Sequence, residues 1–508
     1  MKNKLWILWG LILLKFILQY SLIDPVYELH RDEFLHLDQG RHLAWGYTSV
    51  PPVTSWISYL ILLLGKDVFW VKFFPALFGA LTLLVVWKSI EELKGGWFAL
   101  TLGTLSILFS VLLRINILYQ PTSPDILLWT LLYFFILKYI RSENPRWLYL
   151  TAVVFAVGFL NKYNIAFLVM GLLPALLLTE HRRIFRNKHL YGSAGLALLL
   201  ILPNLIWQFR NNFPVIHHLN ELAATQLVNV NRIDFLKEQV LFFYSSAFVI
   251  AAAWLSFVIY PPFRKYRLIL GSFLFTMLFF VWFRAKGYYA VGLYPILLAF
   301  GAVYLEQILN GKRTKYLRPL ALIIPVLLFL PMFKLAFPNH TPQEIRKEAQ
   351  LYEKIGLLRW EDGKDHALPQ DFADMLGWKE LACKVDSAYA EIPEPEHTLI
   401  LCDNYGQAGA INRYSHIKNI GAVSMSSDYI NWIRLDREIR HVIRIKEVDD
   451  NGHELEESRP YFESVVRFAA ITNAFAREKG TTIYLMKQAR VNVNEIVGKE
   501  IEEQKKQP

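Results

Sequence analysis

The sequence contains little cysteine and a small share of charged residues. Its only two cysteines, Cys383 and Cys402, could form one disulfide, and so few cysteines exclude a disulfide framework. Charged residues make up 19% of the 508 residues, whereas apolar side chains make up 54% and aromatic side chains 15%. This balance is too apolar for a soluble protein of this length and predicts a polytopic membrane protein.

Two further signals are missing from the sequence. No small-x-small cleavage site precedes Tyr27, so the hydrophobic run 5–23 is expected to stay as an anchor rather than to be removed as a signal peptide. The segment NYGQAG (404–409) follows a strand-like run but lacks the glycine spacing of a dinucleotide-binding loop. No low-complexity tract or internal repeat is visible either.

Long hydrophobic runs are frequent before residue 338 and absent after it. A run of about 18 to 20 mainly apolar residues can cross the ~30 Å hydrocarbon layer as a helix. The runs predict a transmembrane domain over 1–337, with a first outer loop at 24–66. Eleven transmembrane helices are expected near 5–23, 68–87, 97–113, 124–140, 147–160, 164–179, 191–207, 239–259, 268–283, 289–306 and 317–336.

Residues 338–508 read as a separate soluble domain. The segment EHTLILCDNYGQAGAINRY (396–414) runs from an apolar strand-like stretch into a helix-like one, the outline of a βα unit. The segment FADMLGWKELACKV (372–385) looks helical, with its apolar side chains packing inward. We therefore expect a mixed α/β domain. The inward residues are Phe372, Met375, Leu376 and Trp378.

The net charge of +10 is concentrated in a few loops. Its Lys/Arg clusters, such as EHRRIFRNKH (180–189), PPFRKYR (261–267) and NGKRTKYLR (310–318), all fall on one side if eleven spans alternate. By the positive-inside rule that side is cytoplasmic, so the N-terminus is expected inside and 338–508 outside the cytoplasmic (inner) membrane. This placement argues for the lipid bilayer, and against nucleic acid, as the partner of the positive charge.

The stretch YELHRDEFLHLDQGRHLAWGYTSVPP (27–52) gathers ionisable groups directly after the first predicted span. Asp32, His36 and Gln39 share one helical face, which predicts a short helix at the outer membrane surface that ends near Gly46. Phe34, Leu35, Leu37 and Leu43 supply its apolar surface. The following segment 49–65 is too short to span comfortably and suggests a second surface or re-entrant helix.

Three acids on the outer side are candidate catalytic groups. Asp32 and Glu33 follow a membrane exit, where partial shielding from water is expected to raise a carboxyl pKa and to suit a general base. Asp125 opens another span in the motif Ser123-Pro124-Asp125 and could share that site. A solvated loop explains the first two acids equally well. An acid near a helix N-terminus, favoured by the helix dipole, explains Asp125.

Cations and tyrosines in the outer loops could complete a site together with these acids. They lie in NKYN (161–164) and RAKGYY (284–289), on the side where short loops normally avoid Lys and Arg. They could bind an anionic headgroup such as a lipid phosphate, although snorkelling cations with interfacial tyrosines explain the same residues. The candidate donor-phosphate residues are Lys162, Tyr163, Arg284, Lys286, Tyr288 and Tyr289.

These groups suit transfer of a sugar from a lipid phosphate. The leaving phosphate is already a stabilised anion, so cations around it and one base for the incoming hydroxyl are sufficient. The rival hypothesis is a transporter or flippase for a lipid-linked or anionic substrate. Transporters usually place their binding groups near the bilayer midplane, whereas the charged groups here lie mainly in loops on one face.

The sequence resembles the membrane glycosyltransferases of the dolichyl-phosphate-mannose protein mannosyltransferase superfamily, including bacterial relatives of the lipid A aminoarabinose transferase. The likeness begins with an Asp-Glu pair before a helix, a GxY and a Pro-Pro. It covers most of the chain. The segments that carry it are HRDEFLHLDQGRHLAWGYTSVPPVTSWISYL, PTSPDILLWTLLYFFILKYI, GFLNKYNIAFL, KGYYAVGLYP, FADMLGWKELACKV and NYGQAGAINRY.

The resemblance implies a polytopic α-helical GT-C fold, a polyprenyl-phosphate-linked sugar donor and inverting transfer to a hydroxyl of a protein, lipid A, another glycan or a lipid at the outer face. By analogy Asp32 is the catalytic carboxylate, with Glu33 beside it and Asp125 as a second acid. Family members differ in metal use, so a divalent metal stays open as a cofactor. The histidine pairs His30/His36 and His217/His218 could bind an ion but lack a compelling ligand spacing, so no metal ligand is assigned.

Overall fold

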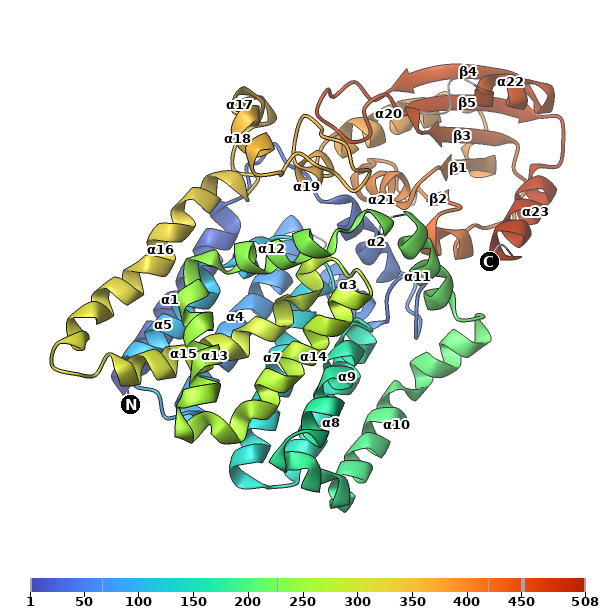
Figure 1. Cartoon of the computed structure of the whole chain (residues 1–508). Helices are drawn as coiled ribbons and strands as arrows, with labels where there is room; N and C mark the ends of the chain where they lie inside the picture. Colours follow the sequence, from blue (N-terminus) through green and yellow to red (C-terminus); the bar gives the residue numbers. More distant parts are fainter. Residues whose placement is uncertain (1, 66, 226, 419, 449–452, 507–508) are drawn as a thin grey trace. The chain divides into compact units, whose positions relative to one another are not determined.

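A computed structural model describes residues 2–506 except 66, 226, 419 and 449–452. The chain folds into two compact units. The first unit comprises 1–23, 44–57 and 63–339, and the second comprises 24–43, 58–62 and 340–508 (Figure 1). The first unit is helical, whereas the second contains a β-sheet.

The first unit is a bundle of apolar helices joined by short 3₁₀ turns (Figure 1). Its α-helices are α1 (Lys2–Ser21), α4 (Val68–Glu92), α5 (Trp97–Leu108), α6 (Val111–Ile115), α7 (Thr122–Ser142), α8 (Arg146–Asn161), α9 (Ile165–Leu177), α10 (Lys188–Arg210), α11 (Pro214–Thr225), α12 (Arg232–Phe242), α13 (Ala247–Ile259), α14 (Arg267–Trp282), α15 (Tyr294–Ile308) and α16 (Arg318–Leu335). The helix α3 (Val53–Leu63) has residues in both units. The 3₁₀ turns are η1 (Glu180–Arg186), η2 (Leu227–Asn229), η3 (Tyr244–Ser246), η4 (Pro261–Tyr266), η5 (Gly287–Leu293) and η6 (Thr314–Leu317).

Each of the eleven predicted spans coincides with a helix, but the count of eleven is not confirmed. Among the described residues, six helices are long and apolar enough to cross a membrane, and two bent pairs bring the total to at most eight. The remaining apolar helices, such as Trp97–Leu108 and Arg146–Asn161, have 10–17 residues. Hydropathy averages over a window and does not register breaks such as the 107° bend between α9 and η1, which follows Pro174 in α9.

Glycines allow the helices of the first unit to approach closely. A Cβ atom on Gly292 would lie 2.9 Å from the Trp129 side chain, so η5 can pack directly against α7. Gly171 lets α9 approach α14 in the same way, next to Ser272 and Thr276. Small residues serve this purpose at helix contacts in membranes because lipid supplies no hydrophobic drive toward association. These contacts hold η5 against α7 and α9 against α14.

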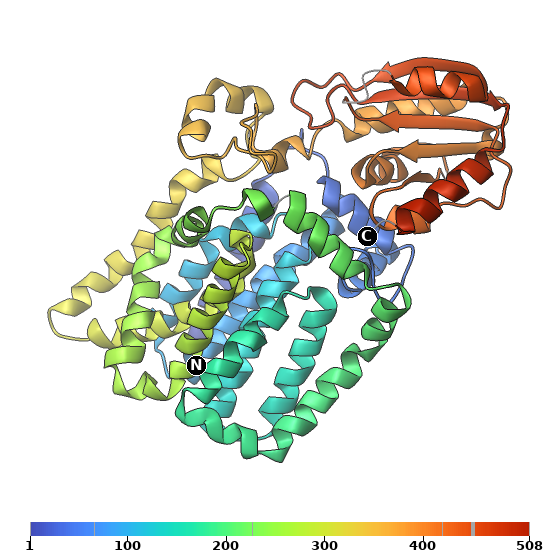
Figure 2. The same ribbon diagram turned by 45° about the vertical axis from the view of Figure 1, so that its right-hand side comes forward.

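The second unit contains a five-stranded sheet with the order β2-β1-β3-β5-β4 (Figure 2). β1 pairs in parallel with β2 and β3, and β5 is antiparallel to β3 and β4. The strands are β1 (Thr398–Cys402), β2 (Ala422–Ser424), β3 (His441–Lys446), β4 (Phe462–Ala470) and β5 (Thr482–Ala489). The helices are α2 (Arg31–Gln39), α17 (Pro342–Lys347), α18 (Ala349–Lys354), α19 (Gln370–Ala373), α20 (Trp378–Ala390), α21 (Tyr405–Tyr414), α22 (His453–Ser458) and α23 (Val493–Lys506).

The predicted βα unit is confirmed as β1 followed by α21. A capping box explains where this helix begins, because the Asn404 side chain accepts a hydrogen bond from Gln407 N at 3.0 Å. The four apolar residues predicted to pack inward from 372–385 are all buried. That segment is two helices, however, because Gly377 adopts a φ of 86° between α19 and α20.

The first outer segment packs with the C-terminal residues, although sequence reasoning assigned all of 24–66 to the transmembrane domain. Phe34 of α2 lies edge-on to Trp378 and Tyr414, with ring centroids 5.7 and 5.6 Å away. Asp38 accepts hydrogen bonds from Asn412 at 2.9 Å and Tyr429 at 2.7 Å. The helix α2 therefore packs as part of the second unit.

Two details of the predicted surface helix are wrong. The helix ends at Gln39, with Gly40 as its C-cap, and does not extend toward Gly46. Gly40 is needed there because a Cβ atom would lie 2.6 Å from Ser58 Cβ. Leu43, expected to supply apolar surface, is 51% exposed beyond the end of the helix.

The two cysteines do not form a disulfide. Cys402 is buried at the end of β1, whereas Cys383 is exposed on α20.

Candidate functional site

The candidate residues are divided between the two units. Asp32 and Glu33 lie on α2 of the second unit. The other seven lie at the ends of helices in the first unit, at the start of α7, the end of α8 and the turn η5 with its preceding residues.

Asp125 is held in a polar pocket in the first turn of α7. Its carboxylate is 4% exposed and accepts hydrogen bonds from Trp129 Nε1 at 2.9 Å and Asn164 Nδ2 at 3.3 Å. Asn164 Nδ2 also lies 3.1 Å from the Tyr289 carbonyl oxygen. One amide therefore ties the acid to η5. α7 begins at Thr122, which places Asp125 in its first turn.

Lys162 directly follows α8, and aromatic rings surround its ammonium group. Its Nζ atom lies 4.4 Å from the Tyr289 ring centroid, 5.1 Å from that of Tyr288 and 3.5 Å from Thr122 Oγ1. It also interacts electrostatically with Asp125. Asp125, Lys162, Tyr288 and Tyr289, with Asn164, are called the Asp125 cluster below. A cation held by ring faces keeps its N–H donors available for an anion.

The remaining predicted residues of the first unit have different surroundings. The Tyr163 hydroxyl donates to Asn204 Oδ1 at 3.1 Å and accepts from Gln208 Nε2 at 2.9 Å, so it holds α10. Arg284 is exposed and has a φ of 52°. Burial of the imidazole lowers the pKa of His218 on α11, and the charge of Lys286 lowers it further.

Glu33 is built into the start of α2. It is fully buried, and its Oε2 atom accepts a hydrogen bond from His30 N at 2.8 Å. His30 Nδ1 in turn accepts from Asp32 N at 3.2 Å, which completes a capping arrangement around the helix N-terminus. The Glu33 carboxylate therefore has a clear local role in beginning the helix.

Asp32 is less buried and faces different partners. Its side chain is 34% exposed, and Oδ1 accepts a hydrogen bond from the Tyr405 hydroxyl at 2.7 Å. The Arg31 guanidinium lies 4.7 Å from the Tyr405 ring centroid. Burial alone would raise the pKa of Asp32, but His30, Arg31 and the Tyr405 hydroxyl together hold it below its usual range. The expectation of a raised pKa is wrong for Asp32 because these positive and donor groups outweigh desolvation.

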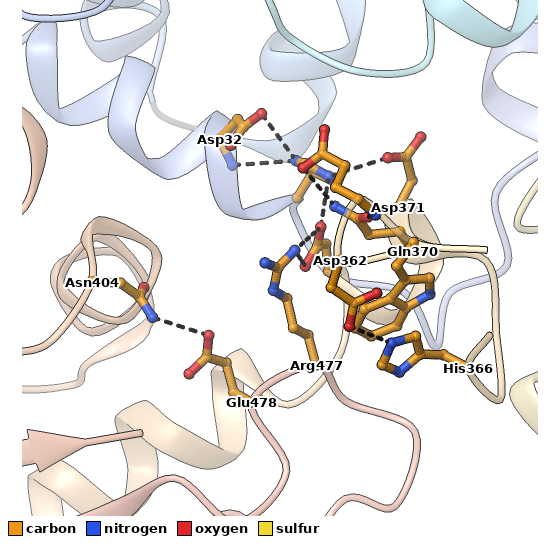
Figure 3. A network of polar contacts seen from close by, with 12 residues as sticks. Asp32, Asp362, His366, Gln370, Asp371, Asn404, Arg477 and Glu478 are labelled. Atoms are coloured by element: carbon orange, nitrogen blue, oxygen red, sulfur yellow. Dashed lines mark hydrogen bonds and ion pairs between the residues drawn. The ribbon is translucent and has the colours of Figure 1, made fainter. Parts of the chain in front are cut away.

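A charged network extends from α2 across the second unit. His30 Nε2 lies 3.6 Å from Asp374 Oδ2 and 3.8 Å from Asp371 Oδ1. Arg477 lies 3.3 Å from the Asp374 carboxylate on another side (Figure 3). Sequence reasoning did not identify Asp374, Arg477 or Tyr405 as members of this network, although Tyr405 stands in the quoted NYGQAG segment. Nothing in that segment alone indicates the partner of its tyrosine.

Within the described ranges no group of three or more His, Cys, Asp or Glu residues is placed to hold a metal ion. His30 and His36 have other neighbours instead, since His30 caps α2 and His36 Nδ1 lies 3.1 Å from Gln39 Oε1.

The chain is similar to one family model and to solved structures of a bacterial membrane protein, ArnT. Residues 49–207 match the family model described as dolichyl-phosphate-mannose-protein mannosyltransferase. No curated protein sequence matches the chain significantly. ArnT from Cupriavidus metallidurans in the apo state is 14% identical with a TM-score of 0.62, over 96% of this chain and 98% of that one. The chain therefore shares the fold of ArnT.

The same ArnT bound to undecaprenyl phosphate is also 14% identical, with a TM-score of 0.61 over 94% of this chain and 97% of that one. At this identity the likeness concerns the fold, and it confirms the expected GT-C architecture with a C-terminal sheet domain. The residues matched by the family model include Asp125, Lys162 and Tyr163. It ends before Arg284 and begins after Asp32.

Proposed function

We propose that the protein is an inverting glycosyltransferase that moves a sugar from a polyprenyl-phosphate-linked donor to a hydroxyl acceptor. The acceptor class is a protein, lipid A, another glycan or a lipid. The family relationship supports sugar transfer in general, and the ArnT complex with undecaprenyl phosphate supports a polyprenyl-phosphate carrier. The observation that carries the proposal is the Asp125 cluster, where a cation stands beside a buried carboxylate at the ends of two helices.

The Asp125 cluster supplies the electrostatics that a departing phosphate requires. Lys162 presents an ammonium group whose ring contacts leave its hydrogen-bond donors for an anion. Charge-assisted hydrogen bonds from such a donor strengthen as negative charge collects on the leaving oxygen. Arg284 and Lys286 are further donor-phosphate candidates. Asp125 either orients the cluster through Asn164 or accepts a hydrogen bond from a hydroxyl of the sugar.

The transfer step is a single displacement at the anomeric carbon. The acceptor oxygen forms the new bond as the bond to the phosphate oxygen breaks, the electron pair leaves with the phosphate, and configuration inverts. Asp32 takes the acceptor proton in this proposal. Its lowered pKa keeps it ionised at neutral pH, which a base requires, although it also makes the carboxylate a weaker base.

The protein is proposed to act at the outer face of the cytoplasmic membrane. The Lys/Arg-rich loops support a cytoplasmic N-terminus and an extracytoplasmic second unit. A lipid-linked donor is then presented on the same side as the loops that carry Lys162, Arg284 and Lys286.

Purified protein in detergent tests the activity class. Incubation with a polyprenyl-phosphate sugar and candidate acceptors should consume the donor and release polyprenyl phosphate, which chromatography and mass spectrometry detect. Detergent micelles have no second compartment, so a transporter or flippase would leave the donor chemically unchanged. Intact donor with every acceptor class would contradict the proposal.

The Asp32→Asn variant tests the assigned base. Asparagine keeps the side-chain shape, so the variant should fold and bind donor while turnover falls about 10²–10⁴-fold. Glu33→Gln is the control, because its carboxylate caps α2 and its loss should lower thermal stability more than turnover. Near-normal turnover in Asp32→Asn, with an inactive Asp125→Asn, would transfer the base role to Asp125.

The Tyr405→Phe variant tests whether the ionisation of Asp32 controls turnover. Removing the hydroxyl that donates to Asp32 should raise the pKa of that carboxyl, so the acidic limb of the turnover profile should move to higher pH. Turnover at neutral pH should change little. An unchanged acidic limb would show that Asp32 ionisation does not control the reaction.

A further inference from the structure

An apolar cavity lies in the helical unit away from the Asp125 cluster. It has a volume of about 390 Å³ and is lined by α7, α8, α9, α10, the turn η1 and Leu268 of α14. In both views α10 stands at the margin of this bundle (Figures 1 and 2). A cavity of this size falls in the range that holds a small ligand or part of a lipid chain.

The cavity extends from the η1 end of these helices toward their middle, and its lining includes no residue of the Asp125 cluster. On α8 its lining runs from Leu148 to Phe155, whereas Lys162 follows the last residue of that helix. At 1.5 Å per residue, Leu148 lies about 20 Å along the axis from Lys162. On α7 the lining includes Tyr139, in the last turns, while Asp125 is in the first turn. A headgroup at the η1 end of the cavity would therefore lie away from a phosphate bound at Lys162.

One end of the cavity carries unpaired positive charge. His181 and Ile184 of η1 line it, and the neighbouring side chains of the same segment are exposed cations. Within the described part of the chain none of these cations has an ion-pair partner, and the one acid of η1 is Glu180. The exposed cations are Arg182, Arg183, Arg186 and Lys188.

The basic end is held in place by side-chain contacts. Asn187 Nδ2 donates to the Tyr139 hydroxyl at 3.2 Å, which fixes the start of α10 to α7. His181 Nε2 lies 2.6 Å from the Lys265 carbonyl oxygen, which fixes η1 to η4. The cations are thus presented beside the apolar cavity by a fixed turn.

We propose that this cavity binds an acyl chain of an anionic phospholipid whose headgroup phosphate rests on the η1 cations. The apolar lining accepts the chain, and the unpaired cations complement a headgroup of net negative charge. A polyprenyl tail would fill apolar space equally well but brings no anion to this end of the helices. A zwitterionic phospholipid brings a phosphate but cancels its charge. The charge of the segment therefore selects the anionic phospholipid.

Native mass spectrometry of the full-length protein in detergent tests the proposal. The probes are dioleoyl phosphatidylglycerol and dioleoyl phosphatidylcholine, which share acyl chains and differ in charge. The protein should bind the anionic lipid about tenfold or more tightly than the zwitterionic one, because each surface cation contributes on the order of one kcal/mol to attraction of anionic lipid. Equal affinities would overturn the proposal.

A triple variant, Arg182→Gln, Arg183→Gln and Arg186→Gln, should lose most of this preference. The matched control is Lys312→Gln, Arg313→Gln and Lys315→Gln, which removes three exposed cations near η6, on a segment that does not line the cavity. The control should keep its preference for the anionic lipid. An equal loss in both variants would show general surface attraction and refute the site.

A steric variant tests the cavity itself. Ala194 lines the cavity and is exposed, so Ala194→Phe should fold while it narrows the space for the chain. Leu199→Phe, at an exposed position of α10 that does not line the cavity, is its control. Only Ala194→Phe should weaken binding of the anionic lipid. Unchanged binding of the anionic lipid in Ala194→Phe would refute the proposal. Loss of a co-purified polyprenyl phosphate in Ala194→Phe, but not in Leu199→Phe, would also refute it.

Discussion

Replacing Lys162 with methionine removes the ammonium group but keeps an unbranched side chain of similar length. In the native protein Nζ lies 4.4 and 5.1 Å from two tyrosine ring centroids and interacts electrostatically with Asp125. Cation–π contacts contribute about 0.5–1 kcal/mol each at exposed sites. The two ring contacts together therefore stabilise the fold by about 1–2 kcal/mol.

The expected effect on the donor is larger than the effect on folding. Loss of a charge-assisted hydrogen bond to the phosphate costs about 1.5–3 kcal/mol, which is roughly one to two decades in donor affinity. Lys162→Met should therefore shift the donor titration about 10–100-fold to higher concentration, with a modest decrease in Tm. The assay is a titration of purified protein with a polyprenyl-phosphate sugar, alongside thermal unfolding followed by intrinsic fluorescence.

Lys138→Met is the matched control for this experiment. Lys138 also has a ring contact, 4.7 Å from the Trp147 centroid, and a carboxylate partner at 2.8 Å in Glu92. It lies near the other end of α7, so its loss should lower Tm without moving the donor titration. A lowered Tm with an unchanged donor titration in Lys162→Met would refute the phosphate role and leave Lys162 as a counter-charge for Asp125.

Three further outcomes are expected. Arg284→Ala and Lys286→Ala should each weaken donor affinity about tenfold in the same titration, with little change in Tm; unchanged curves in both would assign these cations to snorkelling. Glu380→Gln should lower the free energy of unfolding by about 2–3 kcal/mol at neutral pH, since burial is outweighed by hydrogen bonds from Lys384, Thr472 and Asn473 that lower the pKa of Glu380 to about 2. This contribution is complete above the ordinary pKa of about 4.5 and disappears as pH falls toward about 2, so unfolding of the two proteins should converge at acidic pH. A C-terminal fusion to a reporter that works only outside the cytoplasm should be active. Activity of a reporter that works only in the cytoplasm would contradict the predicted topology.

Hydropathy and turn signals predicted much of the local structure because they depend on neighbours in sequence. Every predicted span contains a helix, and the βα unit around Asn404 forms as expected. The number of membrane crossings could not be predicted in the same way, because a hydropathy window does not distinguish a straight span from one broken after Leu177. The helix at 31–39 was also anticipated from its periodicity.

The environment of each candidate residue was decided by tertiary contacts. Asp32 has a lowered pKa because of its neighbours His30 and Arg31, together with the hydroxyl of Tyr405, which lies 373 positions away in sequence. No local pattern indicates that distant hydroxyl. The hydroxyl of Tyr163 is likewise engaged by α10, far along the chain, through Asn204.

The sequence by itself determined which residues are chemically competent, and folding decided which of them meet. Asp125 and Lys162 were both identifiable as an acid and a cation at helix ends, but Asn164 and the tyrosine rings that hold them were placed by packing of η5 against α7. Periodicity and composition report the burial of a face averaged over many residues. A charge's pKa and partners depend on a few atoms within several ångströms, which only the three-dimensional arrangement specifies.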